Sequence, residues 1–119
     1  MSIWGDTMEN KHIISGDQEL RIAHRVGGSI QPNSGGTKFG GGDILTDLFL
    51  IEAKTPFTPK SSFSIRYDWI MKAQEQAFEQ GKLSAVLAFQ FTPYGNNYYI
   101  LNEHDFIEYV NFKEGRYDD

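Results

Sequence analysis

Two charged residues interrupt an otherwise apolar segment at residues 48–54, whose sequence is LFLIEAK. If this segment is a β-strand, Glu52 and Lys54 point to the same face of the sheet, because side chains alternate along a strand. Burying a carboxylate and an ammonium in a core strand is costly, and replacing such a pair by apolar residues is often neutral or stabilising. The pair is therefore expected to have a chemical role rather than a folding role.

Asp43 stands at the head of the preceding strand, and a hairpin would bring its carboxylate close to that of Glu52. Two converging carboxylates attract a hard cation such as Mg²⁺, with water molecules as the remaining ligands. Such a cation neutralises phosphate charge and lowers the pKa of a bound water. Lys54 would then orient the attacking water or stabilise the charge of the transition state. These residue types thus indicate hydrolysis of a phosphodiester.

A simpler interpretation of the same residues is open at this point. Glu52 and Lys54 would form an ordinary ion pair near a strand end, and Asp43 would only begin a strand. Short motifs of the form D…ExK recur by chance, so the surrounding residues have to decide.

The elements that must position these side chains follow from the apolar periodicity and from the turn residues. Thr46 and Asp47 are expected to form the tight turn of the hairpin, and residues 1–14 are expected to be loosely attached. The expected elements are a helix at 15–26 opened by a Ser15–Gln18 capping box, strands at 29–32, 43–45 and 48–55, a helix at 65–80 capped by Ser64 and stopped by Gly81, strands at 83–91 and 97–101, and a helix at 103–110 capped by Asn102.

This order of elements predicts an α/β fold, a mixed central sheet with flanking helices. The first helix is expected to bury Leu20, Ala23 and His24. The second helix has an apolar row and a polar row beside it. The apolar row is Ile65, Trp69, Ala73 and Ala77, and the polar row is Asp68, Lys72 and Gln76.

The composition favours one compact domain without cysteine chemistry. The 119 residues suit a single domain, expected to span 1–119, and a hydrophobic fraction of 39% is enough for a core. With no cysteine, disulfides and thiolate metal sites are excluded. No apolar run approaches the ~20 residues that span a bilayer, and the first residues do not resemble a secretory signal. An intracellular, cytoplasmic protein without a membrane partner is expected.

The net charge of −5 argues at first against a nucleic-acid partner. The acidic excess, however, lies at both ends of the chain. Between residues 20 and 72 the basic residues outnumber the acidic ones; the basic ones are Arg21, Arg25, Lys38, Lys54, Lys60, Arg66 and Lys72. The middle of the chain is therefore basic around the carboxylates that would hold a metal.

Several motifs taken together resemble the PD-(D/E)XK nucleases, and most of all their Holliday-junction-resolvase-like group in archaea, phages and some bacteria. The resemblance covers roughly residues 17–91. It rests on Ser34-Gly-Gly, Gly42-Asp43-Ile, the segment FLIEAKT at 49–55, SSFSI at 61–65, Trp69-Ile-Met-Lys72 and the apolar segment 85–91. It implies an αβββαβ restriction-endonuclease-like core. The proline of the family name is Gly42 here, a position that mainly shapes the backbone.

The resemblance implies roles for individual residues. Asp43, Glu52 and Lys54 match the metal-binding and catalytic positions, and the backbone carbonyl of Ala53 is expected as a further metal ligand. Glu19 matches an acidic residue that completes the metal site in many members; the alternative is a solvated glutamate on a helix face.

The resemblance and the basic middle region together also suggest a surface that contacts DNA. Ser34 corresponds to a residue near the scissile phosphate in resolvases; the alternative is a plain flexible loop. Lys72 and Gln76 lie where many nucleases of this fold carry an additional polar catalytic residue, although exposed helix faces are usually only solvated. The expected DNA-binding residues are Ser34, Arg21, Arg25, Lys38 and Lys72.

The function implied is that of an endodeoxyribonuclease dependent on Mg²⁺, with Mn²⁺ as a substitute, that resolves four-way junctions or other branched DNA. Symmetric cleavage of a junction implies a homodimer, and a phage-encoded protein would act in the host cytoplasm. One rival is a nuclease of the same fold in flap removal, repair or restriction. Another is a DNA-binding protein that has kept the fold without activity. The acidic total charge argues against tight junction binding by a monomer.

Overall fold

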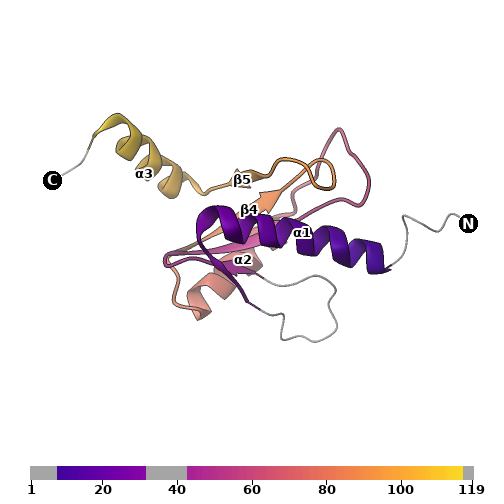
Figure 1. The fold of residues 1–119 in the computed structure, drawn as a ribbon. Coiled ribbons are helices and arrows are strands. Elements are labelled where there is room, and N and C mark those ends of the chain that lie inside the picture. The colour runs from indigo at the N-terminus through magenta and orange to yellow at the C-terminus, as the bar shows by residue number, and fades with distance from the viewer. Residues whose placement is uncertain (1–7, 32–42, 117–119) are drawn as a thin grey trace, which may run out of the picture.

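The computed structural model describes residues 8–31 and 43–116, in which groups of strands are separated by helices (Figure 1). The elements are α1 (Met8–Val26), β1 (Ser29–Ile30), β2 (Ile44–Leu45), β3 (Phe49–Lys54), α2 (Tyr67–Glu79), β4 (Ser84–Phe89), β5 (Tyr98–Ile100) and α3 (Glu103–Glu114). None of the helices in the described residues is long and apolar enough to cross a membrane.

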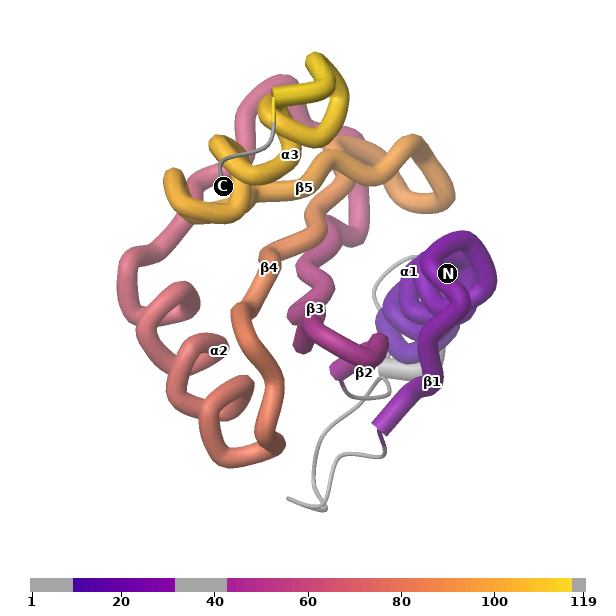
Figure 2. The backbone as a smooth tube through the Cα atoms, turned by 90° about the vertical axis from the view of Figure 1, so that its left-hand side faces the viewer, coloured from indigo at the N-terminus to yellow at the C-terminus, as the bar shows by residue number. Residues whose placement is uncertain are grey.

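The strands form one five-stranded sheet in the order β1-β2-β3-β4-β5. Neighbouring strands are antiparallel except β3 and β4, which are parallel and are connected through α2. The predicted α/β class, mixed sheet and order of elements are confirmed. α1 and α2 lie on opposite sides of the sheet, as the view in Figure 2 shows.

α1 packs on one face of the sheet and is longer than expected. Ile22 is fully buried against Ile44 and Ile51. The expected start at Ser15 is wrong, and so is the expected loose attachment of residues 8–14, because the helix begins at Met8 and Ile14 is buried. Ile14 lies two turns before Ile22, so it extends the same buried stripe and holds the extra turns against the core. Residues 1–7 are outside the described part of the chain.

The expected apolar side of α1 is also wrong. Leu20 is 64% exposed and His24 faces solvent, whereas Ala23 is partly buried as expected. The stripe that faces inward contains two polar residues, Gln18 and Glu19. Hydrophobic periodicity cannot place such residues inside, because it assigns polar side chains to the surface.

α2 covers the opposite face through Ala73 and Ala77, which pack on Leu50 of β3. Its residue before the first turn is Arg66 rather than the expected Ser64, and no side chain caps it. The ring of Phe63 stacks on Phe89 with centroids 5.2 Å apart, and this contact keeps the preceding segment on the sheet until the helix begins.

The β2–β3 hairpin has the expected turn at Thr46 and Asp47. The Thr46 amide donates to the Phe49 carbonyl over 2.9 Å, and the Thr46 hydroxyl accepts from the Phe49 amide over 3.0 Å. The register pairs Ile44 with Ile51. If the same register continues by one residue, Asp43 lies opposite Glu52. Both side chains are then on the face of the sheet that α2 covers.

Gly28 is expected to be indispensable for the close approach of β1 to β2. A Cβ at this position would lie 2.7 Å from the Leu45 carbonyl oxygen and 2.9 Å from a methyl group of Ile44. We expect Gly28→Ala to lower the free energy of unfolding by about 1–3 kcal/mol in urea titrations. Gly16→Ala in α1 is the matched control, since its added methyl meets nothing within 4 Å; it is expected to stabilise the helix by about 0.5–1 kcal/mol. Equal stability of the two variants would contradict this packing.

Candidate metal and phosphodiester site

The carboxyl groups of Asp43 and Glu52 meet across the β2–β3 hairpin and are hydrogen-bonded to each other. Burial raises the pKa of Asp43 to about 7, and the hydrogen bond and the negative charge of Glu52 act in the same direction. Lys54 lowers it. A carboxyl group that keeps its proton close to neutral pH, beside a second carboxyl group, forms a site where a cation can replace that proton.

Lys54 is held beside this pair from two directions. Its Nζ atom lies 3.4 Å from a carboxylate oxygen of Glu52 and 4.4 Å from the centre of the Trp69 ring of α2. An ammonium over an indole face is attracted by the ring's negative π-surface. Trp69 in turn contacts Phe63, whose ring stacks on Phe89, the residue paired with Lys54 on β4. The lysine head group therefore has a defined place above the sheet.

Glu19 of α1 contributes to the same acidic site. Its charge raises the pKa of Asp43, which places its carboxylate within electrostatic range of that group. Glu19 is only 8% exposed, so the alternative of a solvated glutamate on a helix face does not hold. The structure therefore brings together Asp43, Glu52, Lys54 and Glu19, the four side chains that the sequence singled out for catalysis.

A buried polar network fixes the end of β3, where Lys54 lies. Gln18 is 1% exposed, and its amide nitrogen lies 2.9 Å from both the Lys54 carbonyl oxygen and the Asn97 side-chain oxygen. Gln90 is fully buried; it donates to the Thr55 hydroxyl over 2.6 Å and accepts from Arg21 over 2.8 Å. Satisfied polar groups in a core specify one arrangement of the strands that carry them.

Comparison with known proteins does not assign a function to this site. Comparisons with protein families, curated proteins and solved structures found no match to this chain. Its chemistry is therefore inferred from the side chains themselves.

The expected DNA-binding residues have different surroundings. Arg21 is engaged within the protein: its guanidinium donates to Asp17 over 2.9 Å and to the Gly95 carbonyl over 2.8 Å, besides Gln90. Arg21 is therefore less available to a phosphate than the two other described residues of the set, Arg25 and Lys72. Arg25 and Lys72 are exposed and free to face a polyanion. Ser34 and Lys38 lie outside the described residues.

The neighbouring polar residue Gln76 is exposed on α2, as is Lys72. The hydrogen bond from Arg66 and, to a smaller extent, the charge of Lys72 lower the pKa of Asp68. The charges that shift the pKa of Asp43 come from Glu52, Glu19 and Lys54. The structure does not place Lys72 among the groups that act on Asp43.

Sequence reasoning missed Trp69, Gln18 and Gln90 as parts of the site. Trp69 had the spacing of a core residue, and only the crossing of α2 over β3 shows its contact with Lys54. A signal did exist for Gln90, which stands between Phe89 and Phe91 at the end of an apolar strand. A polar residue in such a place needs internal partners.

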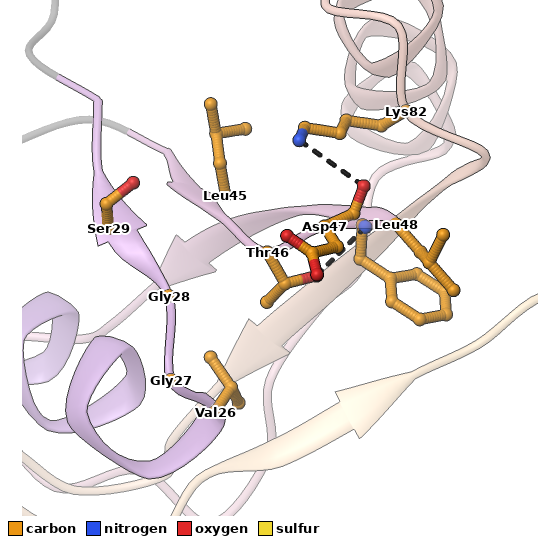
Figure 3. A pocket seen from close by; sticks show the side chains of 10 residues that line it. Val26, Gly27, Gly28, Ser29, Leu45, Thr46, Asp47, Leu48 and Lys82 are labelled. Atoms are coloured by element: carbon orange, nitrogen blue, oxygen red, sulfur yellow. Dashed lines mark hydrogen bonds between the residues drawn. The ribbon is translucent and has the colours of Figure 1, made fainter.

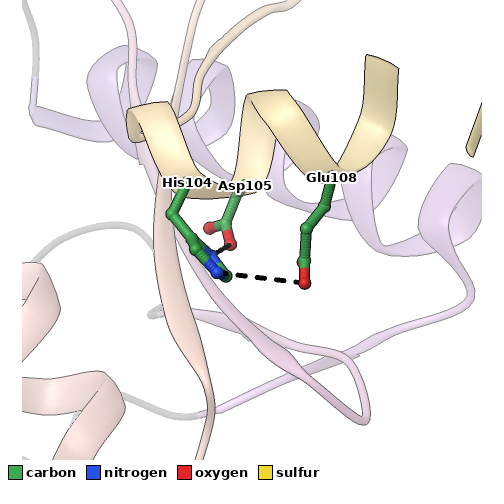
Figure 4. Close-up of side chains that lie close together, drawn as sticks. All are labelled: His104, Asp105 and Glu108. Atoms are coloured by element: carbon green, nitrogen blue, oxygen red, sulfur yellow. Dashed lines mark ion pairs between the residues drawn. The ribbon is translucent and has the colours of Figure 1, made fainter. Parts of the chain in front are cut away.

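Two other features are less suited to chemistry. A hollow of about 600 Å³ lies between the end of α1 and the β2–β3 turn, at the opposite end of β3 from Lys54 (Figure 3). His104, Asp105 and Glu108 come close together on α3 (Figure 4). The side chain of His104 is 79% exposed, and its contacts with Asp105 and Glu108 lie along a helix surface, where such polar contacts are common and weak.

Proposed function

We propose that this chain is a divalent-metal-dependent endonuclease that hydrolyses phosphodiester bonds of DNA. One observation carries the proposal: Asp43 and Glu52 meet as a partly buried pair, in a site that also contains Lys54. The pair destabilises the fold when both groups are ionised, since like charges repel more strongly away from water. Binding of a cation between the two carboxylates is expected to offset this repulsion.

The donor set fits Mg²⁺ or Mn²⁺. Both ions prefer oxygen ligands, and Mg²⁺ is commonly held by one or two carboxylates together with waters and substrate phosphate. Asp43 and Glu52 would provide the carboxylates, with the Ala53 carbonyl and Glu19 as further oxygens. When bound, such an ion neutralises phosphate charge and lowers the pKa of a coordinated water.

Lys54 and the residues that position it would supply the other parts of the mechanism. Lys54 carries a positive charge beside the Glu52 carboxylate, so its ammonium can stabilise negative charge that develops on the phosphate or orient the attacking water. Trp69 and Glu52 keep that ammonium in place from two sides. Gln18, by donating to the Lys54 carbonyl, fixes the backbone from which the lysine extends.

DNA, and branched DNA in particular, follows from the resemblance of the motifs to the resolvase-like PD-(D/E)XK nucleases. The αβββαβ part of the chain would then be a restriction-endonuclease-like core, acting inside the cell. Symmetric cleavage of a four-way junction requires two active sites, so we propose a homodimer as the cleaving form. The exposed basic residues Arg25 and Lys72 would contribute to binding of the phosphate backbone.

The substrate is tested by incubating the purified chain with labelled four-way junction, flap and linear duplex DNA in the presence of Mg²⁺. Paired symmetric nicks in the junction, with little cleavage of the duplex, are expected. Cleavage of the flap alone would replace junction resolution by flap or repair processing. DNA binding without cleavage of any substrate would favour a protein that kept the fold without activity.

The metal requirement gives a separate expectation. Cleavage is expected to stop in excess EDTA, to return with Mg²⁺ or Mn²⁺, and to remain low with Ca²⁺ bound at the same site. Binding has a readout without DNA: Mg²⁺ is expected to raise the melting temperature at pH 8 more than at pH 5.5, because at the lower pH a proton competes for Asp43. Full cleavage in EDTA would rule out the metal mechanism.

A further inference from the structure

The ammonium of Lys54 has two partners, and a divalent cation would affect them differently. Its Nζ atom lies 3.4 Å from a carboxylate oxygen of Glu52 and 4.4 Å from the centre of the Trp69 ring. Glu52 is one of the proposed metal ligands, and carboxylate oxygens are the ligands that Mg²⁺ prefers. The indole of Trp69 has no oxygen to offer a metal, but its π-face attracts an ammonium. A cation would therefore take one partner of Lys54 and leave the other.

In the metal-free chain Lys54 supplies part of the positive charge that the acidic site lacks. Its ammonium is paired with Glu52 and also acts on Asp43, whose pKa it lowers. A divalent cation that approaches the same carboxylates is repelled by this ammonium, because like charges a few ångströms apart interact strongly near a protein surface. Lys54 and the cation thus compete for the same negative charge.

The Trp69 ring is held by contacts that do not involve the metal ligands. Its centroid lies 6.4 Å from that of Phe63, and Phe63 stacks on Phe89 at 5.2 Å. Phe89 is the β4 residue paired with Lys54, so these rings connect the start of α2 to the strand beside β3. The indole is therefore expected to keep its place when Glu52 changes its partner.

We propose that Lys54 exchanges partners when a divalent cation binds: the cation takes the Glu52 carboxylate from the ammonium, and Trp69 keeps the ammonium beside the site. This inference rests on the proposed function, because the exchange needs a cation at Glu52. Trp69 is then a positioning residue that acts through Lys54 and does not touch the substrate. An ammonium released from its carboxylate carries uncompensated positive charge, the form that stabilises a phosphate in the transition state.

Metal binding without DNA tests the competition. Lys54→Met keeps a long unbranched side chain and removes the ammonium. By calorimetric titration it is expected to bind Mn²⁺ about three- to tenfold more tightly than the wild type, because no ammonium has to be displaced. Lys113→Met is the matched control, since the Lys113 ammonium also lies over a ring, that of Tyr109 at 5.9 Å, but on α3; its affinity is expected to be unchanged. If Lys54→Met does not fold, Lys54→Gln takes its place. An unchanged or weaker affinity without the ammonium would overturn the competition.

A double-mutant cycle tests whether the ammonium stays over the indole. The single variants Lys54→Met and Trp69→Leu and the double variant are unfolded in urea, with and without saturating Mg²⁺. The coupling between the two side chains is expected to be about two- to fivefold in the unfolding equilibrium constant, and to persist in Mg²⁺. A coupling that disappears in Mg²⁺ would show that the ammonium leaves the ring together with Glu52, and would overturn the role of Trp69.

Fluorinated tryptophan separates the attraction for the ammonium from simple packing. Fluorine withdraws electron density from the face of the ring and changes its shape little, so it weakens the hold on an ammonium. The chain has two tryptophans, and a Trp4→Phe background confines the label to Trp69. With saturating Mg²⁺, kcat for DNA cleavage is expected to fall stepwise with each added fluorine while KM changes little, because the effect reaches the transition state through Lys54.

Two further variants complete this test. Trp69→Phe keeps a π-face and is expected to retain more of kcat than Trp69→Leu, which is expected to lose about tenfold. The same kcat for all the indoles would make Trp69 a packing residue only. The two proposals fail in different ways. A chain that binds no divalent cation would overturn the proposed metal site and the exchange with it, whereas a chain that binds Mn²⁺ equally well with and without the Lys54 ammonium would overturn the exchange alone.

Discussion

Asp43→Asn is expected to lower DNA cleavage by about a hundredfold or more while the protein still folds and still binds DNA. The substitution keeps the size of the side chain but removes one negative charge from the proposed metal site. DNA binding is expected to persist or to tighten, because a carboxylate that repels phosphate is gone. Cleavage of labelled junction DNA and binding to the same DNA in Ca²⁺ measure the two effects separately.

The matched control for this variant is Asp47→Asn, which removes the same charge from the exposed turn of the same hairpin. Cleavage by Asp47→Asn is expected to be near the wild-type rate. Lys54→Ala is expected to lose cleavage like Asp43→Asn but to bind DNA more weakly, because a positive charge has been removed. Near-normal cleavage by Asp43→Asn would show that the active site proposed here is wrong.

The same variant has a stability signature that depends on pH. Because the pKa of Asp43 is raised from 3.8 to about 7 in the folded protein, the folded state keeps this proton over a range where the unfolded chain has lost it. The wild-type protein is therefore expected to lose stability as pH rises from about 4 to about 7. At pH 8, Asp43→Asn is expected to be more stable by about 1–2 kcal/mol, a value reduced by the partial exposure of the group. At pH 4 the two proteins are expected to unfold at the same urea concentration.

Arg21→Ala is expected to lower the free energy of unfolding by about 2–3 kcal/mol. The guanidinium bridges Asp17, Gln90 and the Gly95 carbonyl, and its loss leaves the fully buried Gln90 without a donor for its side-chain oxygen. Arg21→Lys is expected to recover only part of this loss, since one ammonium cannot reproduce the planar fork of donors. Urea unfolding followed by circular dichroism measures the change.

Arg25→Ala is the control for this prediction, because Arg25 is exposed on the same helix one turn later. Its stability is expected to stay within about 0.5 kcal/mol of the wild type, and its DNA binding to weaken and to depend less on salt. Should Arg21→Ala unfold like the wild type but bind DNA poorly, Arg21 would be a DNA contact and not a structural residue.

The parts of the fold that sequence could predict are those decided by local chemistry. Asn102 caps α3 through its own side chain, and Gly81 follows α2 with a left-handed φ of 73°. The turn at Thr46 and Asp47 fixes the register that sets Asp43 against Glu52. Each of these features depends on residues that are close together in the sequence, so each can be predicted without the rest of the chain.

The parts that sequence could not predict depend on contacts between distant elements. Ser15 and Gln18 have the spacing of a capping box, which predicted a helix start at Ser15. Ile14 packs in the core, however, and the helix extends towards the N-terminus as far as Met8. Gln18 faces inward because its partners are Lys54 and Asn97, far along the chain. The position of Trp69 over Lys54 likewise requires the crossing of α2 over the sheet.

The β2–β3 hairpin also bears on the order in which the chain folds. Asp43 and Glu52 belong to adjoining strands and meet through a local contact, whereas Glu52 reaches Leu87 only across the whole α2 connection. Hairpins close in microseconds, and parallel pairing over a long connection is slower. Before β4 is in place the hairpin is not yet buried, so both carboxylates are ionised at neutral pH and repel each other. The charges of the proposed metal site are therefore expected to slow the folding, and a lower pH or a divalent cation in the surrounding solution is expected to speed it.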